Sequence, residues 1–361
     1  GWFHAERPSF TAARENIAWA AVADQYFTTI VTAVPAAQDA AAQAKQRGVA
    51  VWATRFPVAD AAWKEAGHSS EGNTAARFGI NGALGMPGFT VDPGQSVTQN
   101  FRIYIGPREY GRLQHFPDGE ADVLGFSDVS GLFSFIGPFI GFFSKTLLRS
   151  LNILHAWIGS YAVALIVLTL IIKSLLWPMQ NKATQSMKRM QLLQPKMAEL
   201  KERYASEPEK MSAETMKLYK DYGVNPLSGC LPMFVQIPIF FGFYNMLGKA
   251  VELRNSHFLW IDDLSRPDTI FQLGTIPVNP LPLVMAGTMF WQMAISPKSG
   301  DPAQQRMFMF MPLIFVFFCY NYASALALYW AVQNLFSVVQ LYVTRNQAPP
   351  QLKRVAAKKR K

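Results

Sequence analysis

The chain has 361 residues, of which 50% are hydrophobic, 13% aromatic and only 16% charged, with a formal net charge of +10. Few charges beside many aromatic residues exclude an intrinsically disordered chain, and two cysteines exclude a disulfide scaffold. The positive charge is spread over several segments, so it indicates no single nucleic-acid-binding face.

Residues 1–130 form a slightly acidic block, with 10 Lys or Arg against 13 Asp or Glu. Strand-like stretches at 49–54, 89–91 and 97–105 are separated by turns rich in Pro and Gly. We expect the C-terminal part of an exported antiparallel β-sandwich. Because the chain starts without an export signal, we also expect it to begin inside a larger exported domain that follows a first membrane segment.

Residues 131–154 are apolar but contain Pro138, Lys145 and Arg149. This pattern favours an amphipathic helix lying on the outer membrane surface. A sixth membrane span is the alternative.

Five later stretches approach the roughly 20 apolar residues that a bilayer core requires. Segments such as 165–168 and 315–318 have no polar face, which disfavours a soluble helical protein. The third and fourth stretches are short, and a thinner bilayer around them would accommodate that. The predicted spans are 155–177, 227–248, 280–296, 306–320 and 322–343.

Residues 178–226 predict a helical hairpin between the first two spans. Apolar residues recur at alternating spacings of three and four, as in a coiled-coil seam, at Met190, Leu193, Met197, Leu200 and Tyr204. Pro195 predicts a kink or a helix restart, and a second helix is expected at about 209–222.

The basic residues set the predicted orientation. The hairpin 178–226 has 9 basic and 6 acidic residues, and the tail 345–361 has 7 basic residues and no acidic one. Loops rich in Lys and Arg stay in the cytoplasm. We therefore expect the block 1–130 outside and the tail, together with the hairpin, in the cytoplasm.

The predicted spans contain no Asp or Glu, which disfavours an ion-coupled transporter. No zinc-protease, Walker or nucleophile-elbow motif is present, so we expect no enzyme, metal or cofactor. Lys173 lies roughly 6 Å inside the first span, by the helical rise, although snorkelling to the headgroups would also explain it. Uncharged polar residues also fall in the inner half: Thr169, Gln236, Gln292, Gln333, Asn334 and Gln340. They predict a wet cavity open to the cytoplasm and closed outward, unless they only join helices by hydrogen bonds.

Several ordered motifs carry a family resemblance. They are LQPKM at 193–197, NPLSGCLP at 225–232, QIPIF at 236–240, WIDDLS at 260–265, DPAQQR at 301–306, MPLIF at 311–315 and LYW at 328–330. With these motifs the sequence resembles the YidC/Oxa/Alb family of membrane protein insertases, in its Gram-negative form. It departs from the family at 323–325, where Ala-Ser-Ala replaces a frequent Pro-Ser-Gly.

The resemblance implies a fold with five transmembrane helices and a cytoplasmic helical hairpin, preceded by a periplasmic β-sandwich domain, in the bacterial inner membrane. It also implies a groove open to the cytoplasm and to lipid, with a cation at its base. By motif that cation is Lys173, where many relatives carry Arg. The substrate-contact groove would comprise Thr169, Gln236, Ile237, Phe240, Met289, Gln292, Phe318, Tyr329, Trp330 and Gln333.

The expected function is therefore insertion of nascent hydrophobic segments from the cytoplasm into the bilayer without ATP. The implied partners are nascent membrane proteins, the ribosome, the Sec translocon, the signal recognition particle receptor and anionic lipid. The basic tail would contact the ribosome or lipid through Arg345, Lys353, Arg354, Lys358, Lys359, Arg360 and Lys361. The alternatives are a small-solute channel or transporter, and a membrane chaperone that folds clients without inserting them.

Overall fold

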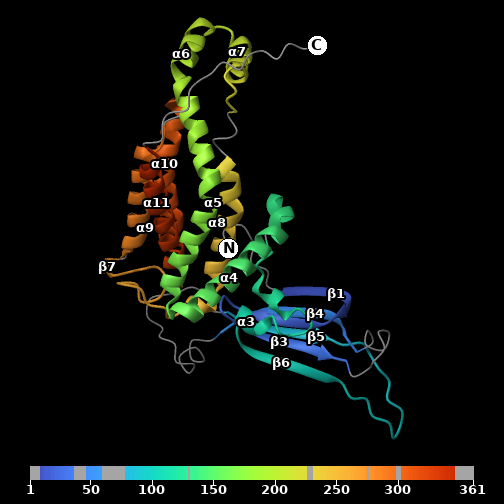
Figure 1. Ribbon diagram of the computed structural model, residues 1–361. Coiled ribbons are helices and arrows are strands. Elements are labelled where there is room, and N and C mark those ends of the chain that lie inside the picture. Colours follow the sequence, from blue (N-terminus) through green and yellow to red (C-terminus); the bar gives the residue numbers. More distant parts are fainter. Residues whose placement is uncertain are drawn as a thin grey trace. The chain divides into compact units, whose positions relative to one another are not determined.

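The computed structural model describes residues 9–35, 46–58, 78–128, 131–225, 231–274, 276–297 and 302–345. The chain divides into two compact units, Gly1–Gly125 and Phe126–Lys361. The first is rich in strands and the second in helices (Figure 1).

The first unit contains two antiparallel three-stranded sheets. One has the order β1 (Ser9–Ile17), β4 (Gly48–Pro57), β5 (Phe78–Gly85), and the other β2 (Trp19–Ala23), β3 (Phe27–Val34), β6 (Asn100–Pro107). The sheets meet where β2 packs against β5. A Cβ added at Gly82 would lie 2.6 Å from Val22 Cγ2, so glycine permits this close approach. The β-rich N-terminal region predicted from sequence is confirmed.

The strand predictions are only partly correct. Residues 49–54 lie within β4, and the stretch 97–105 becomes a strand only from Asn100 onward. Residues 89–91 are not a strand. Pro87 and Pro93 flank them and cannot donate to a ladder, and a turn follows in which Gln95 N donates to Asp92 O at 3.0 Å.

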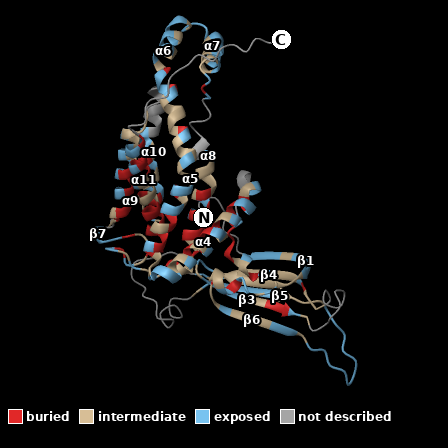
Figure 2. Ribbon diagram, viewed as in Figure 1, coloured by how far each residue is buried: buried red, intermediate tan, exposed pale blue. Residues whose placement is uncertain are grey.

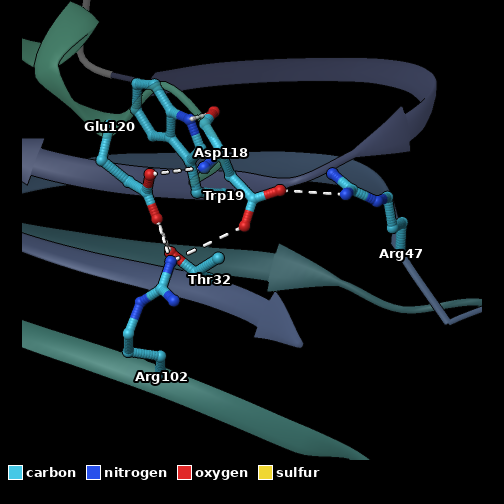
Figure 3. Close-up of polar contacts among 6 residues, drawn as sticks. All are labelled: Trp19, Thr32, Arg47, Arg102, Asp118 and Glu120. Atoms are coloured by element: carbon cyan, nitrogen blue, oxygen red, sulfur yellow. Dashed lines mark hydrogen bonds and ion pairs between the residues drawn. The ribbon is translucent and has the colours of Figure 1, made fainter. Parts of the chain in front are cut away.

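A polar network ties the segment after β6 to the strands (Figure 3). This segment includes α3 (Tyr110–Leu113) and the short 3-10 helix Glu120–Leu124. The buried Glu120 carboxylate accepts hydrogen bonds from Thr32 Oγ1 at 3.1 Å, from Asp118 N at 3.0 Å and from the Arg102 guanidinium. Asp118 also forms an ion pair with Arg47 at 2.9 Å, and its carbonyl accepts from Trp19 Nε1 at 3.1 Å.

We predict that Glu120→Ala destabilises the first unit by about 1–3 kcal/mol, because it leaves the buried Thr32 hydroxyl and the Asp118 amide without an acceptor. Hydrogen exchange of β2 and β3 amides in the full chain measures the loss. Glu109→Ala is the matched control, since Glu109 forms an exposed ion pair with Arg112 and no other ion pair with a described residue. Equal protection of β2 and β3 in both variants would contradict the prediction.

The second unit is a helical bundle in which α11 packs against several other helices. Figure 1 shows these helices, and packing joins α11 to α5, α8 and α9, α10 to α9, and α4 to α5 and α8. Buried residues gather on their facing sides (Figure 2). The helices are α4 (Gly137–Ile158), α5 (Tyr161–Leu192), α6 (Gln194–Arg203), α7 (Pro208–Asp221), α8 (Leu231–Lys249), α9 (Pro280–Ile295), α10 (Pro302–Cys319) and α11 (Ser324–Arg345). The short 3-10 helices Gly131–Ile136 and Val251–Leu253 and the strand pair β7 (Phe271–Leu273) and β8 (Ile276–Val278) complete the unit.

Two helices, α5 and α11, are long and apolar enough to cross a membrane, while α9 and the segment Met309–Cys319 of α10 are apolar but shorter. The count of five spans therefore remains a prediction. Helix α4 runs past residue 154 and ends at Gly159, whose φ of +79° terminates it, so α5 begins at Tyr161 and not at His155. Helix α5 then continues through Pro178 into the hairpin.

The restart predicted at Pro195 is confirmed, because α5 ends at Leu192 and α6 begins at Gln194. Met190 and Leu193 are buried with Val224 at the base of the hairpin, and Tyr219 and Tyr222 pack against them. Burial raises the pKa of Tyr219. Helices α6 and α7 themselves contain no buried residue, so this cluster at their base holds the hairpin together.

Candidate functional site

Lys173 is buried between α5 and α11, with only 5% of its surface exposed. Its Nζ donates to Ser337 Oγ at 3.3 Å, and Ser337 Oγ in turn donates to Gln333 O at 3.0 Å. Within the described ranges, no carboxylate lies at ion-pair distance from this ammonium group. A buried charge without a counter-ion is costly, which makes Lys173 a candidate functional residue.

A second polar cluster joins α8 to α11. Gln236 Nε2 donates both to Tyr329 Oη at 3.0 Å and to Gln333 Oε1 at 2.9 Å. The Tyr329 ring is buried and stacks on Phe243, with centroids 4.1 Å apart. Gln333 therefore belongs to both clusters and links Lys173 to α8.

The α11 members of both clusters lie on one face of that helix, which we call the polar seam. Its members recur every three or four residues, the spacing that puts side chains on one helical face: Tyr329, Gln333, Ser337, Gln340 and Thr344. Beyond Ser337, Gln340 Nε2 donates to Trp177 O at 3.4 Å, and Thr344 O accepts from Lys188 Nζ at 3.0 Å. The polar seam thus follows α5 from Lys173 to Lys188.

Aromatic rings flank the same region. Phe240 of α8 meets Trp330 edge to face at 4.8 Å, and Phe315 of α10 lies 4.3 Å from Trp330. Ile237, three residues before Phe240 on α8, is half-buried. Phe318 of α10 is 72% exposed. These rings present an apolar wall next to the polar seam.

The structure brings together only part of the predicted groove. Lys173, Gln236, Tyr329 and Gln333 form one connected polar set, and Phe240 pairs with Trp330. Thr169 is one turn from Lys173 but is 1% exposed, and its hydroxyl donates to Leu165 O at 2.7 Å.

The remaining predicted residues lie apart from that set. Met289 and Gln292 are half-buried on α9, and the hydrogen bonds and ring contacts of the polar set do not include them. Arg345 ends α11, while the other basic tail residues lie outside the described residues.

Sequence reasoning missed Ser337, Thr344 and Lys188. Ser337 follows Gln333 by four residues, so the spacing of the polar seam could have found it. In the sequence Lys188 was considered only as one of the nine basic residues of the segment 178–226. Its contact with Thr344 depends on α5 continuing past Pro178, which the predicted end of the first span at residue 177 did not include.

A pocket of about 350 Å³ lies at the hairpin end of the bundle, where α5 continues toward α6. It is bounded by α5, by the end of α9 and by the end of α11. Its lining residues are Thr184, Lys188, Ala294, Ile295, Pro297, Leu341, Tyr342 and Thr344.

The opposite end of the bundle, where the segment 250–279 lies, is tied by polar contacts. Asn279 Nδ2 donates to Tyr320 O at 2.6 Å. Asp268 Oδ2 accepts from Leu281 N at 2.7 Å and from Trp260 Nε1 at 3.1 Å. These bonds fix the start of α9 and the turn between α10 and α11.

Apolar helices packed around buried polar groups and a buried lysine are typical of an integral membrane protein. Residues 153–351 match the family model of the 60Kd inner membrane protein. The chain therefore belongs to the YidC/Oxa/Alb family of membrane protein insertases, and the resemblance seen in its sequence is confirmed. Such insertases are not enzymes in the catalytic sense, and the homologues are inner membrane proteins.

Individual relatives of the chain support the same family. The chain is 40% identical over 270 residues to the membrane protein insertase YidC of Syntrophus aciditrophicus, covering 74% of this chain and 46% of that protein. It is also 40% identical over 289 residues to that of Pelobacter propionicus, covering 76% and 51%. The chain thus spans about half the length of these relatives.

A solved structure titled "Active YidC insertase crystal structure with the first transmembrane domain resolved" superposes with a TM-score of 0.46 and 19% identity. The superposition covers 94% of this chain and 79% of that one. A similarity of this size does not by itself define a fold, and family membership rests on the sequence match.

We predict that Gln236→Leu destabilises the bundle by about 1 kcal/mol, because it removes two interhelical hydrogen bonds that average about 0.6 kcal/mol each in membranes. Thermal unfolding in detergent measures the change. Gln292→Leu is the matched control, since the Gln236 bonds do not involve it. The prediction is wrong if both variants unfold at the wild-type temperature.

Proposed function

We propose that this chain inserts nascent hydrophobic segments from the cytoplasm into the lipid bilayer, without ATP, through a groove beside the polar seam. In this proposal the chain has five spans, its N-terminal unit is periplasmic, and the hairpin and the tail are cytoplasmic. The groove is hydrated and open toward the hairpin end. The carrying observation is Lys173, buried against Ser337 without a carboxylate partner in the described part of the bundle.

The physical reason is the cost of moving polar groups through lipid. A client segment carries a polar flank, and an ionised side chain at the bilayer centre costs at least about 2.5–3.5 kcal/mol on insertion scales. A cation inside the protein attracts an acidic flank, and the polar seam offers it hydrogen-bonding groups. The flank then crosses a shorter low-dielectric path than it would through lipid alone.

The apolar wall serves the other part of the client. Phe240 and Trp330 form a ring pair beside the polar seam, and the exposed Phe318 lies on α10. A hydrophobic segment can leave along these rings into lipid while its flank stays near Lys173. Thr169 and Tyr329 are almost fully buried, so client contact with either residue requires the helices that cover it to move apart.

The observations favour an insertase over a small-solute channel. A channel needs a continuous polar path, whereas the contacts of Asn279 and Asp268 support closure at the end opposite the hairpin. The predicted spans also lack the carboxylates that ion-coupled transporters use.

Partners follow from the same proposal. Nascent membrane proteins are the clients, and the basic tail binds the ribosome or anionic lipid. The Sec translocon and the signal recognition particle receptor are proposed to deliver or receive some clients.

We predict that Lys173→Glu abolishes insertion of a client with a short acidic exported tail, because like charges then repel, while Lys173→Arg retains insertion. Insertion into proteoliposomes, scored by protease protection of the client tail, measures the effect. Lys182→Glu is the matched control, since Lys182 lies exposed on the same helix. Full insertion by Lys173→Glu, or solute flux through client-free proteoliposomes, would count against the proposal.

Deleting residues 347–361 removes six basic residues. We expect the deletion to weaken ribosome binding severalfold at low salt and to have less effect as salt rises, because salt screens exposed charges. Co-sedimentation of detergent-solubilised protein with ribosomes gives the readout. If binding is unchanged at low salt, the tail does not hold the ribosome.

A further inference from the structure

We propose that the pocket at the hairpin end is a first docking site for the acidic flank of a client, with Lys188 as its cation. The client would meet Lys188 before it reaches Lys173. This inference rests on the proposed function and adds a second binding site to it.

The pocket has the chemistry of a site for one carboxylate on a polypeptide. Its volume of about 350 Å³ lies within the range of small-ligand sites. Among the described residues of the lining Lys188 is the only charged one, and Thr184, Tyr342 and Thr344 add hydroxyl groups. Ala294, Ile295 and Leu341 supply an apolar surface for the carbon atoms beside the carboxylate.

Lys188 is held in place yet keeps donors for a ligand. Its Nζ donates to Thr344 O at 3.0 Å, which fixes the ammonium group at the end of α11. An ammonium group has three donors, so two remain for a carboxylate. The side chain is only half-buried, and a client can therefore reach it.

The polar seam connects this pocket with Lys173. Thr344 lines the pocket, and Gln340 and Ser337 continue the seam to the Lys173 ammonium. From Thr344 to Ser337 the helical rise is roughly 10 Å. A carboxylate that moves this far along α11 passes from one lysine to the other while polar side chains remain beside it.

A carboxylate of a passing client fits this pocket better than a resident phospholipid phosphate. The C-terminal ends of α9 and α11 border the pocket, and their partial negative charge weakens the binding of a carboxylate and of a phosphate alike. Sites for lipid phosphate usually gather several basic side chains, whereas Lys188 is the one cation among the described residues that line this pocket. The balance favours a weak, reversible contact, which a docking step requires.

The test uses two clients that differ only in two exported flank residues, Asp in one and Asn in the other. The full chain carries p-benzoylphenylalanine in place of Tyr342 and is reconstituted in proteoliposomes. Photo-crosslinking to stalled clients is compared for wild type, Lys188→Gln, Lys188→Arg and the exposed control Lys182→Gln. Detergent melting checks that each variant is folded.

We expect Lys188→Gln to lower crosslinking to the Asp client about threefold, the effect of one partly exposed ion pair, and to leave the Asn client unchanged. Lys188→Arg restores the crosslink, and Lys182→Gln behaves as wild type. An equal loss with both clients would overturn the inference in favour of a structural role. The same variants are also labelled with a photoactivatable phosphatidylglycerol. If Lys188→Gln loses this lipid labelling but keeps its client crosslinks, the inference is overturned in favour of a lipid site.

The two proposals can fail separately. If wild type inserts both clients and Lys188→Gln crosslinks normally, only the docking site is wrong. If wild type inserts neither client, the proposed function and the docking site are both wrong.

Discussion

The burial of Lys173 without a counter-charge among the described residues is the constraint on which the helical unit of this protein depends. An ammonium group in a low-dielectric interior is tolerated only when polar groups or water surround it. Ser337 supplies one such group, and the hydrogen bonds of Gln333 and Gln236 extend the polar surroundings to α8. The helices must therefore keep a polar interior next to their apolar surfaces.

The position of α11 in the bundle makes this possible. It contacts α5, α8 and α9, so one face can carry the polar seam while Asn334 on another bonds to Thr288 of α9 at 3.1 Å. The end opposite the hairpin is joined by Asn279, Tyr320 and Asp268. The hairpin end has instead a pocket. This asymmetry is what a one-sided groove needs.

The sequence could predict the membrane class, the helical hairpin and the residue Lys173, because hydropathy, proline positions and the absence of intramembrane carboxylates are local properties. Gln236 stood out as an uncharged polar residue within a predicted span, and family motifs then supplied Tyr329 and Trp330. The exact helix ends were less predictable, since the break at Gly159 and the continuation through Pro178 depend on backbone conformation. The contacts of Lys188 and Ser337 were missed because they join segments 156 and 164 residues apart. No local pattern specifies such a pairing.

A groove that is open only toward the hairpin lets water reach position 173 from the hairpin side alone. The most direct measurement places cysteine at position 173, with Cys230 and Cys319 replaced by alanine, in membrane vesicles of known orientation. A membrane-impermeant maleimide is then added to one side at a time. We expect labelling from the side of the hairpin and none from the opposite side. Labelling from the opposite side, or from neither, would contradict it.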